Sequence, residues 1–412
     1  MSVRELLELH GKPPREVYFD LENSGYVPPE VVSEMMPYFN SVGYGHPSIT
    51  HKPGWEAYEA IYRAKEVLKQ ILGAGSYEEF VFTHSGTEAN NLAVLGLALA
   101  RRGTRGKIVV STIEHLSVIY PAEVAESLLG FKVVRVPVDS EGFVLPEVLQ
   151  EVVDRSTVLV SIQFVNHEIG TVQDVEELSK VVKEVNPDAV FHTDAADAFG
   201  RLRIDLGKLK NVDMLTLSSH KIHGPRGVGV LYVREGTRLE PVLRGQLSAE
   251  KLWPGVENVP LIVGFRKAVE LAFADFEGSV AKMRSLRDRL VEGILSRVPD
   301  VLVNGPRDPA KRAPDNANLS FLYVEGEALT VELSMRGVYV SSGSACTSRI
   351  LEPSHVLLAI GRKHEEAHGS ILFKTSRYHT ENDVDYAVEA VAGAVERLRR
   401  LSPLGKTISP QL

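Results

Sequence analysis

Three features of the sequence, each placed directly after an apolar run, could together bind one phosphorylated aromatic cofactor. Ser85-Gly86-Thr87 opens a helical pattern, where backbone N–H groups and a hydroxyl group can bind an anion. Asp194 follows a second run, and a carboxylate beside a buried strand needs a cationic partner such as a protonated pyridine nitrogen. Lys221 follows a third run, and its amine can form a Schiff base with a carbonyl group. The three would bind different parts of one molecule.

Other polar residues near these runs add to the same site. Ser218 and His220 could donate further hydrogen bonds to a phosphate group, and His115 offers a flat ring for stacking or proton transfer. Asn166 follows another apolar run. Each residue alone is weak evidence for a site. A Ser-Gly turn before a helix is often only a cap, most histidines are structural, and most lysines are solvated surface charges. The ordered set, rather than any one member, indicates a cofactor site.

The elements that must position these residues form an alternating pattern from about residue 55 to residue 235. Helical segments lie between some of the apolar runs, which favours a mostly parallel sheet covered by helices on both faces. In such a sheet, ligands bind at the carboxyl ends of the strands, where the polar residues fall. The expected strands are Phe80–Thr83, Lys107–Ser111, Val133–Val136, Thr157–Val165, Ala189–His192, Met214–Leu217 and Val228–Val233.

The second half of the chain predicts a smaller α/β domain. A long helical pattern over Leu261–Val298 could link the two domains, and strand-like pieces alternate with helices from about Val301. We expect a large domain over residues 17–262 and a small domain over residues 263–404 joined by residues 1–16. Residues 405–412 would be a tail.

Composition excludes several classes of function. The 412 residues carry a formal net charge of -8, so nucleic acid is not an expected partner. No apolar run approaches the roughly 18 residues that would span a membrane. The first residues are mixed and charged and do not read as a signal peptide. Cys346 is the only cysteine and cannot form an internal disulfide, so we expect a cytoplasmic protein and no metal site.

The order and spacing of the motifs resemble the cysteine desulfurases of the class V, fold-type I enzymes that depend on pyridoxal 5'-phosphate (PLP). The likeness covers roughly residues 17 to 400 and implies a large domain with a mostly parallel seven-stranded sheet. It is carried by the stretches Tyr44-Gly45-His46-Pro47-Ser48, Thr87-Glu88-Ala89-Asn90-Asn91, Glu114-His115, Val165-Asn166-His167-Glu168-Ile169-Gly170, His192-Thr193-Asp194-Ala195-Ala196, Ser218-Ser219-His220-Lys221-Ile222-His223-Gly224-Pro225-Arg226-Gly227, Ser341-Ser342-Gly343-Ser344-Ala345-Cys346-Thr347-Ser348 and Leu351-Glu352-Pro353-Ser354.

The resemblance implies a role for each candidate residue. Lys221 would carry PLP, Asp194 would pair with the pyridine nitrogen, and His115 would stack on the ring and move protons. Asn166 would approach the phenolic oxygen of the cofactor. The phosphate group would be held by Gly86, Thr87, Ser218 and His220.

Cys346 is the nucleophile that the resemblance implies. Its neighbours are small and polar, which favours an exposed loop over a buried, inert thiol. The thiolate would take sulfur from L-cysteine as a persulfide, release alanine, and pass the sulfur on by exchange. The acceptor would be an iron–sulfur scaffold protein or the machinery for thiolated tRNA, and the enzyme would be a homodimer.

Two departures from the family concern charge near the cofactor. The family usually has a glutamine where this sequence has Asp197, and a carboxylate cannot donate to the phenolic oxygen. We expect either a protonated Asp197 or an unusually basic Schiff base. Leu372 replaces the arginine that binds the substrate carboxylate. Lys374, two residues on and on the same strand face, and Arg377 are the candidate replacements, unless both are only surface charges.

Two further departures change the surroundings of the site. Trp253 and Val256 replace an arginine and a threonine, and the threonine contacts the phosphate group of the partner subunit's cofactor in the family. Leu21-Glu22-Asn23-Ser24-Gly25 replaces Asn-Asn-Ala-Thr-Thr, which alters the entrance and makes Asn23 a candidate substrate contact.

Three hypotheses about function remain open at this point. The first is a cysteine desulfurase. The second is a lyase or aminotransferase of the same class that acts on another amino acid, which Leu372 and Asp197 favour. The third is a weakly active homologue that serves as a docking partner for a cluster scaffold, against which the intact Lys221 argues.

Overall fold

The computed structural model describes residues 5, 8, 10, 11, 13–246, 250–342 and 353–401. Cys346 therefore lies outside the described residues, as do Gly343-Ser344-Ala345 and Thr347-Ser348 beside it. No helix in the described part of the chain is long and apolar enough to cross a membrane.

The large domain is built on a seven-stranded sheet in the order β2-β8-β7-β6-β5-β3-β4. Only β8 runs antiparallel to its neighbours, so the mostly parallel sheet expected from the sequence is confirmed. The strands are β2 (Phe80–Thr83), β3 (Lys107–Ser111), β4 (Lys132–Val136), β5 (Thr157–Ser161), β6 (Val190–Asp194), β7 (Met214–Ser218) and β8 (Gly229–Val233).

Apolar residues on both faces of the sheet explain why helices cover both sides. Successive strand residues point to opposite faces, and Phe80 and Phe82 pack into one hydrophobic cluster whereas Val81 packs into the other. The first cluster takes in α2 (Pro29–Met35), α4 (Lys52–Leu72), α7 (Pro146–Val152), α8 (Val175–Val185) and α9 (Val259–Ala274). The second takes in α5 (Gly86–Ala100) and α6 (Leu116–Leu129). A short α3 (Pro37–Asn40) follows α2.

One expected strand is shorter than predicted. The apolar run Thr157–Val165 continues as strand only to Ser161, so the prediction is wrong for its last residues. The backbone N–H of Gln163 donates to the buried carboxylate of Glu114, at 3.0 Å, in place of a neighbouring strand. Beyond Ser161 the chain therefore turns into the cavity edge that carries residues 163–168.

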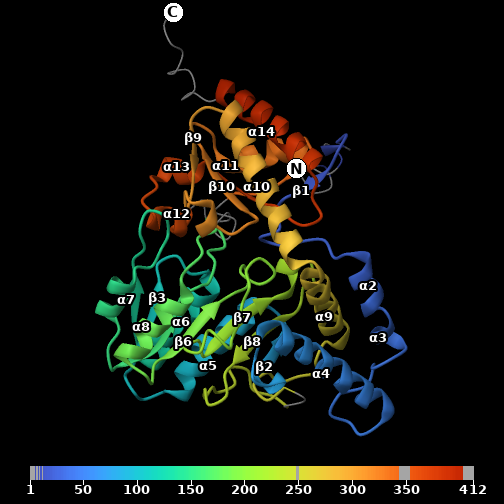
Figure 1. The fold of residues 1–412 in the computed structure, drawn as a ribbon, viewed down its shortest axis with the longest axis vertical. Helices are drawn as coiled ribbons and strands as arrows, with labels where there is room; N and C mark the ends of the chain where they lie inside the picture. Colours follow the sequence, from blue (N-terminus) through green and yellow to red (C-terminus); the bar gives the residue numbers. More distant parts are fainter. Residues whose placement is uncertain are drawn as a thin grey trace, which may run out of the picture.

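The smaller domain has its own sheet and core (Figure 1). Four strands lie in the order β12-β13-β10-β9, and β1 pairs with β11 in a separate ribbon. The elements are β1 (Val17–Tyr18), β9 (Val301–Val303), β10 (Asn316–Phe321), β11 (Val338–Tyr339), β12 (Ser341–Ser342), β13 (Ser370–Lys374), α10 (Phe276–Arg297), α11 (Gly326–Met335), α12 (His355–Ala359), α13 (His364–His368) and α14 (Glu381–Leu401). Val17 and Phe19 pack into this core from the N-terminal segment.

The long helical pattern between the domains is two helices rather than one. The helix α9 ends at Ala274 and α10 begins at Phe276, with Asp275 between them. The Asp275 carboxylate caps α10 by accepting a hydrogen bond from the backbone N–H of Gly278 at 3.2 Å. In Figure 1, α10 rises from α9 in the large domain and lies beside α14 in the small domain. The helix pair thus connects the two sheets.

Candidate active site

A cavity of about 230 Å³ lies at the carboxyl ends of the large sheet's strands, where the small domain covers them. Of the site residues predicted from the sequence, the cavity lining brings together Asn23, Gly86, Thr87, His115, Asp194, Asp197, Ser218, His220 and Lys221. The small domain contributes Ser341, Ser342 and Leu372. Asn166, Lys374 and Arg377 are absent from this lining. Most of the predicted set therefore meets in one cavity despite its wide spacing along the chain.

One end of the cavity is a tight turn between β2 and α5. The Ser85 hydroxyl caps α5 by accepting a hydrogen bond from the backbone N–H of Glu88 at 3.1 Å. A Cβ atom on Gly229 would lie 2.2 Å from the backbone carbonyl of Ser85, so β8 approaches this turn closely enough to require glycine. Ser218 Oγ lies 3.0 Å from His220 Nδ1 at the same end. These hydroxyl groups and helix N–H groups suit an anionic group.

The side chain of Asp194 reaches the cavity from the last position of β6. Its Oδ2 accepts a hydrogen bond from Asn90 Nδ2 at 2.7 Å, and its Oδ1 accepts one from the backbone N–H of Ala196 at 3.0 Å. Burial raises the pKa of Asp194, although these hydrogen bonds oppose the rise. A carboxylate in this position is stabilised as an anion by a bound cation, which a protonated ring nitrogen would provide.

His115 is an electrically neutral ring in the cavity wall. Burial lowers its pKa to about 3. Its Nδ1 accepts a hydrogen bond from the backbone N–H of Ser117 at 3.1 Å, at the start of α6, and this places the proton of the neutral ring on Nε2. A neutral imidazole of this kind can stack on an aromatic cofactor and can accept or deliver a proton.

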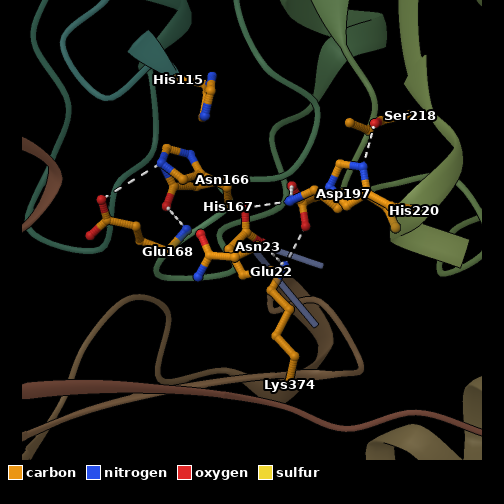
Figure 2. A network of polar contacts seen from close by, with 12 residues as sticks. Glu22, Asn23, His115, Asn166, His167, Glu168, Asp197, Ser218, His220 and Lys374 are labelled. Atoms are coloured by element: carbon orange, nitrogen blue, oxygen red, sulfur yellow. Dashed lines mark hydrogen bonds and ion pairs between the residues drawn. The ribbon is translucent and has the colours of Figure 1, made fainter. Parts of the chain in front are cut away.

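Lys221 belongs to a cluster of four buried charges that we call the charge cluster: Glu22, Asp197, Lys221 and Lys374. Each carboxylate bridges both lysines. Lys221 Nζ lies 3.0 Å from Asp197 Oδ2 and also contacts Glu22, and Lys374 Nζ lies 2.7 Å from Glu22 Oε2 and also contacts Asp197. Figure 2 shows Lys374 reaching up to the two carboxylates. The four formal charges sum to zero, and their mutual attraction offsets part of the free-energy cost of removing them from water.

The charge cluster keeps both carboxylates ionised. Burial alone would raise the pKa of Asp197, but the ammonium groups of Lys221 and Lys374 and the guanidinium group of Arg201 hold it well below its usual range. The same two lysines lower the pKa of Glu22 against the effect of its burial. Of the two expectations raised by Asp197, a protonated carboxyl group is therefore disfavoured, and an unusually basic Schiff base stays a prediction.

The predicted substrate-binding residues lie in different surroundings. Lys374 is 1% exposed in its side chain and directs its charge to Glu22 and Asp197, while Leu372 of the same strand lines the cavity. Arg377 lies over the ring of Tyr378 and donates to its hydroxyl group at 3.1 Å. Asn23 lines the cavity and donates to Asp20 at 2.6 Å. A role for these three in substrate binding stays a prediction.

Asn166 was expected to approach the phenolic oxygen of the cofactor, but it is its neighbour His167 that lies in the cavity lining. The Asn166 amide donates to the Ile113 carbonyl at 3.0 Å and accepts from the backbone N–H groups of Glu168 and Ile169, so it holds the turn together. His167 lines the cavity instead. Sequence reasoning missed both His167 and Glu22 as site residues. The available signal was that each lies within a motif stretch that the sequence had already singled out.

The two substitutions in the segment before α9 also have defined surroundings. Trp253 is buried, and its indole N–H donates to His84 Nδ1 at 3.2 Å. Val256 is 63% exposed, so most of its side chain faces away from the described part of the chain. An exposed position here is compatible with a contact to a second subunit.

Comparison with known proteins gives a consistent result. The sequence matches the family described as Aminotransferase class-V over residues 17–387. It is 43% identical over 388 residues to "Cysteine desulfurase IscS 1" of Archaeoglobus fulgidus, covering 94% of this chain and 99% of that protein. Among solved structures it is similar to a "NifS-like protein" (TM-score 0.86, 34% identity, 93% of this chain and 100% of the other). It is also similar to "SspA in complex with cysteine" (TM-score 0.77, 34% identity, 88% and 99%).

Proposed function

Because the chain belongs to the cysteine desulfurases of the class-V aminotransferase family, we propose that it binds PLP and removes sulfur from L-cysteine, releasing alanine. The families to which it is related depend on PLP. The observation that carries the proposal is the convergence of Lys221, Asp194 and His115 on one cavity with an anion-binding turn at its end. Each of these groups suits a different part of the cofactor.

The residues present fit the cofactor. The turn at Ser85-Gly86-Thr87, with Ser218 and His220, would hold the phosphate group, Asp194 would face the ring nitrogen, and Lys221 would bond to the carbonyl carbon. When bound, PLP supplies an electron sink for the bonds at the substrate's α-carbon. Asn166, which is the sequence-derived candidate for the phenolic oxygen, would act by holding the turn that carries His167.

The chain's own groups would handle protons and sulfur. His115 Nε2 carries a proton in the neutral ring and can exchange it with the substrate. Cys346 is the proposed nucleophile and would hold the sulfur as a persulfide before passing it to an acceptor thiol. The acceptor would be an iron–sulfur scaffold or a tRNA-thiolating protein.

We also propose a cytoplasmic homodimer. Large apolar side chains are exposed over neighbouring stretches of the N-terminal half, among them Met36, Phe39, Tyr44, Trp55 and Tyr58. Exposed apolar side chains that gather into one patch are typical of a subunit interface, and we expect these to do so.

Desulfuration is tested by incubating PLP-loaded protein with L-cysteine and a thiol reductant, and measuring sulfide and alanine together. We expect equal amounts of both products, lost in Cys346→Ala while the cofactor absorbance of that variant remains. Wild-type protein that carries PLP but forms neither product would contradict the proposal. Because Leu372 faces the cavity, that result would favour another amino acid as substrate, with Leu372→Arg as the first variant to restore activity toward L-cysteine.

Gly229→Ala is expected to weaken PLP binding about tenfold or more. The new methyl group would lie 2.2 Å from the Ser85 carbonyl, and overpacking of this kind typically costs about 1–3 kcal/mol. The measurement is an absorbance titration of the apoprotein with PLP. Gly75→Ala is the matched control, because a Cβ there meets only the end of the Glu79 side chain, at 3.5 Å. Equal affinities in the two variants would show that the turn does not hold the phosphate group.

A further inference from the structure

The described part of the cavity lining offers no arginine for the carboxylate that every α-amino acid substrate carries. Leu372 presents an apolar side chain, and the ammonium group of Lys374 is paired with Glu22 and Asp197. A carboxylate taken out of water needs a positive charge or several hydrogen-bond donors to offset the loss of hydration. The described lining contains other groups that could supply them.

Few side chains in the described lining can carry a positive charge, and most of these are otherwise engaged. Lys221 contacts Glu22 and Asp197 and is required for the cofactor. Burial lowers the pKa of His115 to about 3 and that of His220 to about 4, so both rings are neutral near pH 7. His167 is the remaining candidate in this part of the lining.

His167 is held in a fixed position by neighbouring groups (Figure 2). Its ring meets the ring of His115 edge-on, with centroids 5.1 Å apart and an interplanar angle of 77°. Its Nε2 lies 3.6 Å from Glu168 Oε1, and the other oxygen of Glu168 accepts a hydrogen bond from Ser354 Oγ at 2.5 Å. The ring is 6% exposed, and its buried Nδ1 has no hydrogen-bond partner among the described residues.

The charges around His167 favour its protonated form. Burial alone would lower its pKa, but Glu168, Glu22 and Asp197 raise it above the ordinary value of 6.5. The other titratable groups that face it are His115 and His355, which have lowered pKa values, and Glu114, whose burial raises its pKa to about 8. Lys221 and Lys374 pair with Glu22 and Asp197 within the charge cluster, so Glu168 is the carboxylate beside the ring that this cluster does not neutralise.

We propose that His167, oriented by Glu168, supplies the positive charge that binds the α-carboxylate of the amino-acid substrate. This inference rests on the proposed function, because it takes the substrate to be an α-amino acid. It also explains how the site tolerates Leu372: the charge comes from the edge of the large sheet rather than from β13.

The test compares two ligands that differ only in the carboxylate. L-alanine and L-alaninamide are titrated into PLP-loaded protein, and binding is followed by the change in cofactor absorbance. In His167→Asn and His167→Gln we expect the dissociation constant of L-alanine to rise about tenfold to a hundredfold, the usual range for a lost hydrogen bond to a charged group. Binding of L-alaninamide should change less than about twofold. His364→Asn, at an exposed histidine, is the matched control.

The pH dependence of ligand binding shows whether His167 acts through its positive charge or only by supporting the structure of the site. The wild-type preference for L-alanine over L-alaninamide should fall as the pH rises through the pKa of His167, above 6.5, because the neutral ring no longer attracts the carboxylate. The preference should not vary in this way in His167→Asn. If the His167 variants lose affinity equally for L-alanine and L-alaninamide, or lose affinity for neither, the inference is overturned while the proposed function stays intact. Wild-type protein that takes up no PLP would overturn the proposed function and this inference together.

Discussion

Replacing Lys374 with methionine is expected to destabilise the apoprotein by about 3–5 kcal/mol. Lys374 touches both carboxylates of the charge cluster, and its side chain is 1% exposed. Without it, Lys221 would be the one lysine left in the charge cluster to offset Glu22 and Asp197. Removing one partner of a buried ion pair leaves an uncompensated charge, and this lowers the free energy of unfolding by more than the intact pair adds to it. The measurement is the free energy of unfolding in urea.

The pH dependence of the loss tests its electrostatic origin. A buried carboxylate that has lost its cation binds a proton more readily than the same group in the unfolded chain, so its pKa in the folded state is raised. Stability is then lost as the pH rises, and the defect of Lys374→Met should shrink as the pH falls. A defect that is the same at all pH values would indicate lost packing instead.

Two further variants control the Lys374 experiment. Glu22→Gln combined with Lys374→Met removes one charge of each sign and should recover most of the lost stability, since neutral replacements of a buried pair are usually well tolerated. Lys210→Met changes an exposed lysine and should alter stability by less than about 0.5 kcal/mol. A loss below about 1 kcal/mol in Lys374→Met would contradict the paired charges of the cluster.

Lys221→Ala is expected to lose all desulfuration and also to lose stability. Two effects combine in this variant, because Lys221 is both the proposed attachment point of PLP and one of the two cations that neutralise Glu22 and Asp197. Borohydride reduction followed by mass analysis should find a pyridoxyl group on Lys221 in the wild type and none in the variant. Urea unfolding of the apoprotein should show a loss similar to that of Lys374→Met.

Lys221→Arg separates these two roles of Lys221. The guanidinium group keeps the positive charge beside Glu22 and Asp197 but does not form the bond to PLP. We expect this variant to be as inactive as Lys221→Ala while retaining more of the wild-type stability. If both variants unfold at the same urea concentration, the charge of Lys221 has no stabilising role and only its chemistry matters.

Much of the site was predictable because its parts lie at the ends of strands. Apolar runs rich in β-branched residues favour buried strands, and the carboxyl ends of parallel strands meet at one edge of the sheet. Ser85-Gly86-Thr87 follows β2, and Lys221 follows β7. Asp194 is the last residue of β6. Their meeting in one cavity follows from that order along the chain. The seven-stranded sheet and its two covering helix layers were predictable for the same reason.

The charge cluster was not predictable from the same patterns. Glu22 and Lys221 are 199 residues apart in the sequence, and Asp197 and Lys374 are 177 apart, with one member of the four coming from the small domain's β13. No local pattern states that a carboxylate in the N-terminal segment will meet a lysine of that strand. Asp197 and Glu22 belonged to two separate departures and Lys374 was a candidate for the substrate carboxylate, whereas the structure joins all three as mutually neutralising charges.

The sequence by itself determined the family, the strand positions and the polar residues that follow the strands, because apolar patterning and turn chemistry can be recognised in short stretches of the chain. From these the place of the cavity could be predicted. Tertiary structure decided which charges are paired and which remain available to a substrate. Lys374 faces the charge cluster, Asn166 holds a turn, and His167 lines the cavity. The physical reason is that the ionisation and availability of a side chain depend on burial and on neighbours brought from distant parts of the chain.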